Sequence, residues 1–160
     1  MSSKIDVFQA IEDGDIEEVQ KYIDEEGDID IRVGGWSPLH KAISWNEIDI
    51  FKLLLKVGAD VNILENNGWT PIYSAILYNR EEMFKPLLKA GADVNIPDNN
   101  GRYPIDWVIE DKNIEIIKLL LDNGAEVNFK KLKQTDEELY NKYYLKPRMG
   151  VMYDLLDIYK

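Results

Sequence analysis

The apolar residues of this chain are spaced for short helices that come in pairs. Leu39, Ala42 and Ile43 fall on one face of a short helix, and the following segment IDIFKLLLKVG repeats apolar side chains at the same spacing. Apolar residues three and four positions apart share one side of a helix. A polar stretch, ADVN and then ENNG, follows this second helix. The pattern therefore predicts a unit of helix, turn, helix and hairpin-like loop.

This unit recurs with a period of 33 residues. The glycines, prolines and asparagines that punctuate it stay in register: Gly35, Gly68 and Gly101; Pro38, Pro71 and Pro104; Gly58, Gly91 and Gly124; Asn62, Asn95 and Asn128. A weaker copy, VFQAIEDGDIEEVQKYIDEEGDIDI, precedes them. No unit of this size can bury its apolar face alone, so we expect the units to stack.

The punctuation residues predict where the helices begin and end. Ser37 and Thr70 are expected N-caps, each followed by a proline at the first helical position, where no hydrogen bond is lost. Gly58 is expected to end the second helix in the left-handed conformation. Asn and Gly in ENNG and DNNG tolerate positive φ and indicate turns.

These segments resemble ankyrin repeats. The family pattern G-x-T-P-L-H-x-A-A, with a second helix that ends L-L-x-x-G-A-x-x-N, is matched over roughly residues 5–128. The matching positions are Gly68, Thr70, Pro71, Ala75, Leu87, Leu88, Gly91, Ala92 and Asn95, with Ser37, Pro38, Leu39, His40 and Ala42 in the preceding repeat. The resemblance implies an all-α solenoid of stacked helix-turn-helix units in a single domain.

The expected division is an N-terminal capping repeat at 1–33, repeats at 34–66, 67–99 and 100–132, and C-terminal capping helices at 133–160. Some residues depart from the family pattern. Tyr103 replaces the capping Thr, Asp106 replaces the His, and Pro86 is expected to kink its helix or delay its start. TDEELYNKYY, with a Thr135 cap, and VMYDLLDIYK are predicted helices. They either cap the stack or contact the partner.

Composition narrows the class of protein. The net charge is −11 over 160 residues, which argues against binding to nucleic acid or an anionic membrane. There is no apolar run long enough to span a bilayer, and there is no cysteine, so we expect a cytoplasmic protein. Residues 1–30 hold 11 acids and 2 lysines, a net charge of −9. This acidic end either keeps the protein solvated or steers a basic partner toward it.

The residues do not predict an enzyme. His40 is the only histidine, and in the resembled family this position bonds neighbouring loops. Carboxylate pairs such as Glu81 and Glu82 stand at helix starts, where they complement the helix dipole. No phosphate-loop or nucleophile motif is present. We therefore expect no catalytic residue, no cofactor and no metal site.

The resemblance places a binding surface on the hairpin tips and first helices, which form the concave face in this family. Its expected residues are Trp36, Trp69, Arg102, Asn66, Asn67, Asn99, Asn100, Trp45, Tyr78, Glu12, Asp13, Glu110, Asp111 and Trp107. Tryptophan, tyrosine and arginine are enriched in binding hot spots. The aromatic residues either meet a partner or pack across adjacent repeats and stiffen the stack.

The predicted function is non-enzymatic recognition of another protein by a chain that is a monomer when free. One version is an inhibitor or immunity protein that covers a basic toxin or enzyme. The other version is a general intracellular scaffold or adaptor.

Overall fold

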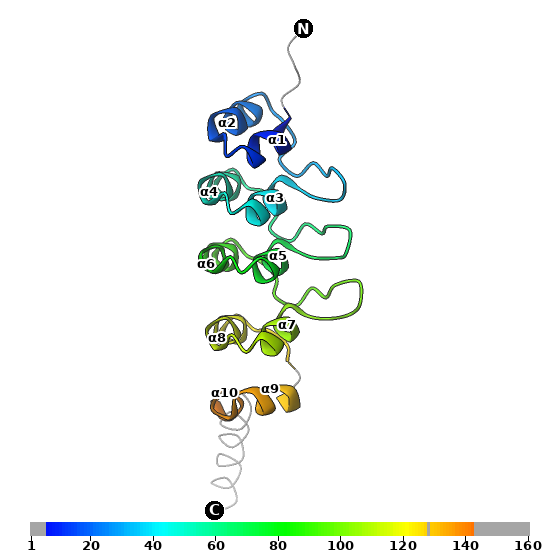
Figure 1. The fold of residues 1–160 in the computed structure, drawn as a ribbon, viewed down its shortest axis with the longest axis vertical. Coiled ribbons are helices and arrows are strands. Elements are labelled where there is room, and N and C mark those ends of the chain that lie inside the picture. Colours follow the sequence, from blue (N-terminus) through cyan, green and yellow to red (C-terminus); the bar gives the residue numbers. More distant parts are fainter. Residues whose placement is uncertain (1–5, 128, 143–160) are drawn as a thin grey trace, which may run out of the picture. The chain divides into compact units, whose positions relative to one another are not determined.

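The computed structural model describes residues 6–127 and 129–142 (Figure 1). The chain falls into two compact units, Met1–Pro104 and Ile105–Lys160. Helices account for the regular structure of the described ranges, apart from one isolated β-bridge. The expectation of an all-α repeat fold is confirmed.

In the first unit, three pairs of helices form two layers (Figure 1). The pairs are α1 (Val7–Glu12) with α2 (Ile16–Asp24), α3 (Pro38–Trp45) with α4 (Ile48–Lys56), and α5 (Pro71–Leu77) with α6 (Glu81–Lys89). The inner helix α3 packs against both α1 and α5. Long loops extend from the inner layer, on the side away from the outer helices α2, α4 and α6.

The second unit holds another helix pair and two short helices. The pair is α7 (Pro104–Asp111) with α8 (Ile114–Asp122), and α9 (Phe129–Thr135) packs on α10 (Glu137–Tyr140). Helix α9 is not among the predicted helices, which begin only at Thr135 in this part of the chain. The predicted cap at Thr135 is wrong, because Asp136 accepts the bond from the Leu139 N–H while Thr135 ends α9. The predicted helix VMYDLLDIYK lies outside the described residues.

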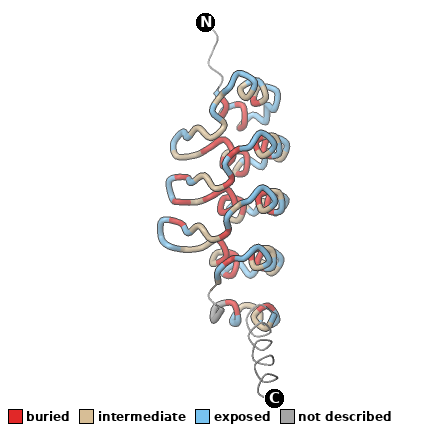
Figure 2. Tube along the Cα trace, turned by 180° about the vertical axis from the view of Figure 1, so that it is seen from behind, coloured by how far each residue is buried: buried red, intermediate tan, exposed pale blue. Residues whose placement is uncertain are grey.

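The core consists of the apolar positions that the helical spacing picks out. In the first unit, buried positions follow the inner helices and the sides of the outer helices that face them (Figure 2). Leu39, Ile43, Phe51, Phe84 and Leu87 are essentially inaccessible to solvent. Burying a side chain of this size contributes about 2 kcal/mol. The first unit therefore depends on contacts between its repeats, as expected for repeats that cannot bury their apolar faces alone.

The predicted helix starts are confirmed in position, and one differs in detail. Ser37 caps α3, and its hydroxyl oxygen accepts a hydrogen bond from the His40 N–H at 3.3 Å. Thr70 stands at the N-cap of α5, but its buried hydroxyl has no hydrogen-bond partner. Pro86 lies inside α6, yet α6 begins 33 residues after α4 and has the same length, so its start is not delayed.

Three tip loops, residues 33–36, 65–69 and 98–102, end the hairpins of the first unit. In the first, Val33 and Trp36 exchange two backbone hydrogen bonds, of 3.0 and 3.1 Å, around two glycines with positive φ. In the second, the Glu65 N–H donates to the carbonyl of Trp69, so the loop has one residue more. Val33 thus corresponds to Glu65 and Trp36 to Trp69, so the first tip loop is one residue shorter than the second. The shorter loop explains why the N-terminal copy is shifted by 32 residues instead of 33, so that Ala10 aligns with Ala42 and Ile29 with Val61.

Candidate protein-binding surface

Trp36 and Trp69 stand at the ends of the first two tip loops, where the repeat register places them. The backbone of Trp69 is fixed on both sides. Its N–H donates to the Glu65 carboxylate at 3.1 Å, and its carbonyl accepts from the Glu65 N–H and from the His40 ring, both at 3.0 Å. Both tryptophan side chains are half-buried.

His40 is a structural residue that ties its helix to the next tip loop, as predicted. It is fully buried, and the Ser37 hydroxyl lies 2.9 Å from its Nδ1. Its Nε2 faces the Trp69 carbonyl oxygen at 3.0 Å. A carbonyl only accepts hydrogen bonds, so the proton of the neutral ring belongs on Nε2, and Ser37 donates to Nδ1. Burial lowers the pKa of His40 to about 4, against a weaker opposing effect of the Trp69 carbonyl.

Tyr73 takes the place of His40 in the next repeat. Its hydroxyl donates to the carbonyl oxygen of Arg102 at 2.9 Å, again 29 residues further along the chain. The phenol ring offers no nitrogen near the helix start. This explains why the hydroxyl of Thr70 is left without the ring partner that Ser37 has.

Three ring pairs show how the aromatic side chains lie. Trp36 contacts His40 edge-on and also meets Tyr78 of the following repeat, with ring centroids 6.3 Å apart in each pair. Trp69 stacks on Tyr73 with centroids 6.0 Å apart and planes within 7° of parallel. Each tryptophan therefore packs one side against the stack. The two interpretations of the aromatic residues are thus compatible, since a half-buried ring is both braced and accessible.

We call Trp36, Trp45, Trp69 and Tyr78 the aromatic strip. Trp45, at the end of α3, is its most accessible member, with 47% of its surface exposed. The repeat register also places Leu77 and Val33 on this surface, and 42% and 54% of them are exposed. Leu77 precedes Tyr78 at the end of α5, and Val33 is bridged to Trp36. An apolar surface around these aromatic rings is what a partner could desolvate.

Two buried carboxylates shape the second and third tips, and sequence reasoning missed both. Glu65 accepts hydrogen bonds from the N–H groups of Asn67 and Trp69. Asp98 accepts from those of Asn100 and Arg102, both at 2.9 Å. Only 4% of Glu65 and 5% of Asp98 is exposed. The two acids lie 33 residues apart, directly before Asn-Asn-Gly, and this spacing was the available signal.

The turn asparagines hold adjacent tips together. The side-chain amide of Asn66 donates to the Gly34 carbonyl at 3.0 Å, and that of Asn99 donates to the Asn66 carbonyl at 2.8 Å. The Asn67 amide turns toward the Glu65 carboxylate. Asn66, Asn67 and Asn99 are exposed, but part of their hydrogen-bonding capacity is used inside the protein. Asn100 is also exposed, next to Gly101.

The predicted acidic residues at the N-terminal end of the surface have different surroundings. Glu12, at the end of α1, forms an ion pair with Lys41 of α3. The ammonium of Lys41 also lies over the ring of Trp45, 3.8 Å from its centroid. Asp13 is exposed and accepts a hydrogen bond from the Gln9 amide at 3.0 Å.

Arg80 fixes the end of α3 near Trp45. Its guanidinium donates to the carbonyls of Ile43 and Ser44, at 3.1 and 2.8 Å. These carbonyls belong to the last turn of a helix, where intrahelical partners are lacking. Arg80 thus joins two repeats and steadies the backbone that carries Trp45.

The remaining predicted site residues are divided between the units. Arg102 ends the third tip of the first unit and is half-buried. Trp107, Glu110 and Asp111 lie on α7 of the second unit, where Trp107 is half-buried and the two acids are exposed.

A family model for ankyrin repeats, in three copies, matches residues 7–98 and 63–131. The chain belongs to the ankyrin repeat family. Among curated proteins, none matches the sequence closely enough to count as a relative. Ankyrin repeats are protein-interaction modules, so membership defines the general class of function of this ankyrin protein.

Two other findings concern the described part of the ankyrin chain. None of its helices is long and apolar enough to cross a membrane. Within the same residues, no group of three or more histidine, cysteine, aspartate or glutamate side chains is arranged to hold a metal ion.

Proposed function

We propose that this ankyrin protein is a non-enzymatic binding module that recognises another protein through the aromatic strip. The observation that carries the proposal is the set of accessible apolar residues on α3, α5 and the first tip, together with the ring contact that joins the first tip to the end of α5. Trp45, Leu77 and Val33 are each more than two-fifths exposed, and Trp36, close to Val33 in the chain, contacts Tyr78, the neighbour of Leu77. Large aromatic side chains at the centre of an interface supply most of its binding energy.

The braced backbone supports the same proposal. Trp69 is held by Glu65 and His40, and Trp36 by its bridge to Val33. A side chain whose backbone is already fixed loses less conformational entropy when a partner binds. We infer that the strip is organised before binding, so that the partner meets it with little rearrangement.

We further propose that the partner is a basic protein whose activity is blocked on binding, as for an inhibitor or immunity protein. The support is the charge distribution. The first 30 residues carry a net charge of −9, and the remaining residues carry only −2. Such an asymmetric charge raises the association rate with a basic partner and orients it on approach. An adaptor role is the competing proposal, because the same surface can hold a partner without blocking it.

The test is recovery of the partner from the native cell by affinity capture, followed by binding measurements with purified proteins. The double variant Trp36→Ala and Trp69→Ala should weaken the partner's affinity by a factor of about 100 or more. Val57→Ala is the matched control, because Val57 is an exposed apolar residue at the end of outer helix α4. Unchanged affinity in a folded double variant contradicts the proposal.

Two measurements separate inhibitor from adaptor. For an inhibitor of a basic protein, the partner's activity falls in proportion to the complex formed. The association rate also falls steeply as salt is raised, because exposed charges are screened. Full activity of the bound partner favours the adaptor, and a rate independent of salt contradicts the charge argument.

A further inference from the structure

Three side chains from two repeats meet at the N-terminal end of the aromatic strip. Lys41 and Trp45 are four residues apart on α3, so they lie on the same side of the helix. The Lys41 ammonium lies 3.8 Å from the centre of the Trp45 ring and pairs with the carboxylate of Glu12 from α1. The Lys41 side chain is only 15% exposed. Its charge therefore lies within the surface, between a carboxylate and an aromatic face.

A carboxylate beside an exposed aromatic face is the chemistry that recognises a cation. The carboxylate supplies the opposite charge, and the ring attracts the cation through its electron-rich face. Lys41 satisfies both groups from within the protein. Its four-carbon stem is flexible, so the ammonium can also extend into water when another cation takes its place.

We propose that Glu12 and Trp45 form a subsite for an arginine side chain of the partner, and that Lys41 occupies this subsite until the partner displaces it. The inference rests on the proposed function, and it specifies what the partner presents at this end of the strip. An arginine has the advantage over Lys41, because its planar guanidinium stacks on tryptophan and binds a carboxylate through two hydrogen bonds. Lys41 thus selects against weaker cations.

The neighbouring charges fit this assignment. Asp13 follows Glu12, is exposed, and adds negative charge beside the subsite. Arg80, the N-cap residue of α6, is committed to the carbonyls of Ile43 and Ser44. Once Lys41 has moved away, the carboxylates of Glu12 and Asp13 remain to attract a cation.

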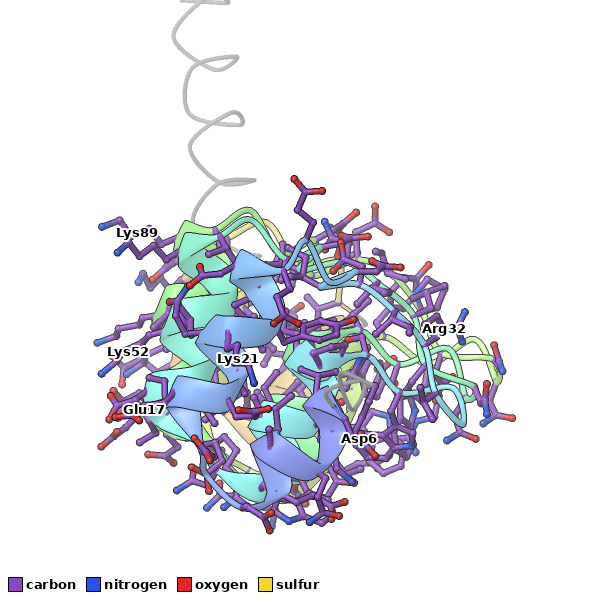
Figure 3. All side chains as sticks on the ribbon, turned by 90° about the horizontal axis from the view of Figure 1, so that it is seen from above. Asp6, Glu17, Lys21, Arg32, Lys52 and Lys89 are labelled. Carbon is purple, nitrogen blue, oxygen red and sulfur yellow. The ribbon has the colours of Figure 1, made fainter. Side chains whose placement is uncertain are left out.

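The experiment follows the indole N–H resonance of Trp45 in the full-length protein by NMR. The probes are the blocked amino acids N-acetyl-arginine N-methylamide and its lysine counterpart. We expect millimolar binding of the arginine probe to the Lys41→Ala variant, at least about fivefold tighter than to the wild type, because an internal competitor has been removed. Lys52→Ala is the matched control. Lys52 lies on outer helix α4, on the opposite side of the fold from Arg32 in the first loop (Figure 3). Its replacement by alanine should therefore leave the binding of the arginine probe unchanged.

A second variant keeps the test independent of any change in folding. Adding Glu12→Gln to Lys41→Ala should abolish binding of the arginine probe, and Glu12→Gln alone should shift the Trp45 resonance as Lys41 loses its partner. Equal binding of the arginine probe to wild type and Lys41→Ala, or binding that survives without Glu12, overturns the inference. This result is distinct from failure of the proposed function, which is measured on the native partner with Trp36 and Trp69 replaced.

Discussion

The hydroxyl of Tyr73 donates to the carbonyl oxygen of Arg102 at 2.9 Å, at the position where His40 contacts Trp69 in the preceding repeat. Two different side chains therefore perform the same task, which is to hold the last residue of the following tip loop. The tip residues Trp69 and Arg102 belong to the predicted binding surface. Their placement thus depends on buried groups that no partner touches.

Replacing Tyr73 by Phe removes this hydrogen bond and leaves the rest of the ring in place. We expect the free energy of unfolding to fall by about 1–2 kcal/mol, because the Arg102 carbonyl loses a donor in a partly buried site. Urea unfolding measures the loss. Tyr78→Phe, at the C-cap of the same helix α5, is the matched control, and a loss of equal size there would contradict the assigned role of Tyr73.

The two helix caps should respond in opposite ways. Ser37→Ala removes a hydroxyl that bonds both the N–H and the ring of His40, so we expect a loss of about 1–3 kcal/mol. Thr70→Val replaces a buried hydroxyl that has no partner, so it should be neutral or stabilise by up to about 1 kcal/mol. Thermal and urea unfolding compare the two. A clear loss of stability in Thr70→Val would show that its hydroxyl is bonded.

His40 should make the protein less stable as the pH falls. Its pKa is about 4 in the folded protein and 6.5 in an unfolded chain, so below pH 6.5 only the unfolded chain binds the proton. The contribution of neutral His40 to the free energy of unfolding is complete above pH 6.5 and is lost as the pH falls toward 4. Each pH unit in this window costs about 1.4 kcal/mol, which amounts to about 2 kcal/mol at pH 5.

The variant His40→Gln isolates this effect, because glutamine can still donate to the Trp69 carbonyl but does not titrate. Urea unfolding at pH 7 and pH 5 should show a smaller loss in the variant than in the wild type. All other side chains are the same in the two proteins, so their contributions cancel in the comparison. An equal loss of stability in the wild type and in His40→Gln would mean that His40 takes up its proton in the folded state as well.

Lys112 occupies a backbone position that suits asparagine. Its φ is 56°, and the corresponding residues of the preceding repeats are Asn46 and Asn79, with φ of 65° and 53°. Lysine is disfavoured in this left-handed conformation, so Lys112→Asn should stabilise α7 and α8 by about 0.5–1 kcal/mol. Amide hydrogen exchange in those helices measures the gain. The reverse change, Asn79→Lys, should accelerate exchange in α5 and α6, and the absence of both effects contradicts the assignment.

Much of the fold could be predicted because the repeat is punctuated by residues with strong backbone preferences. Prolines 38, 71 and 104 begin inner helices, and the outer helices α4, α6 and α8 are each nine residues long and spaced by 33. These features follow from local chemistry, which a single sequence contains. The cap of α10 was misplaced by one residue because Thr135 and Asp136 are both good caps.

The surface was harder to predict, because its details depend on contacts between repeats. Glu65 and Asp98 belong to a residue class that is usually exposed, and their burial follows from the way each tip folds back over the carboxylate. The contact of Trp36 with Tyr78 and the ion pair of Lys41 with Glu12 also join different repeats. Periodicity places residues on a face, but it does not say which side chains will touch.

The asparagine bonds between the tips give the row of loops a direction. Asn66 donates back to Gly34 and Asn99 donates back to Asn66, so each of these two tips holds the one before it. A change at Asn99 should therefore disturb the loop that carries Trp69, and a change at Asn66 the loop that carries Trp36. A substitution at one of these asparagines therefore displaces the recognition residue of the preceding repeat and not the one in its own repeat.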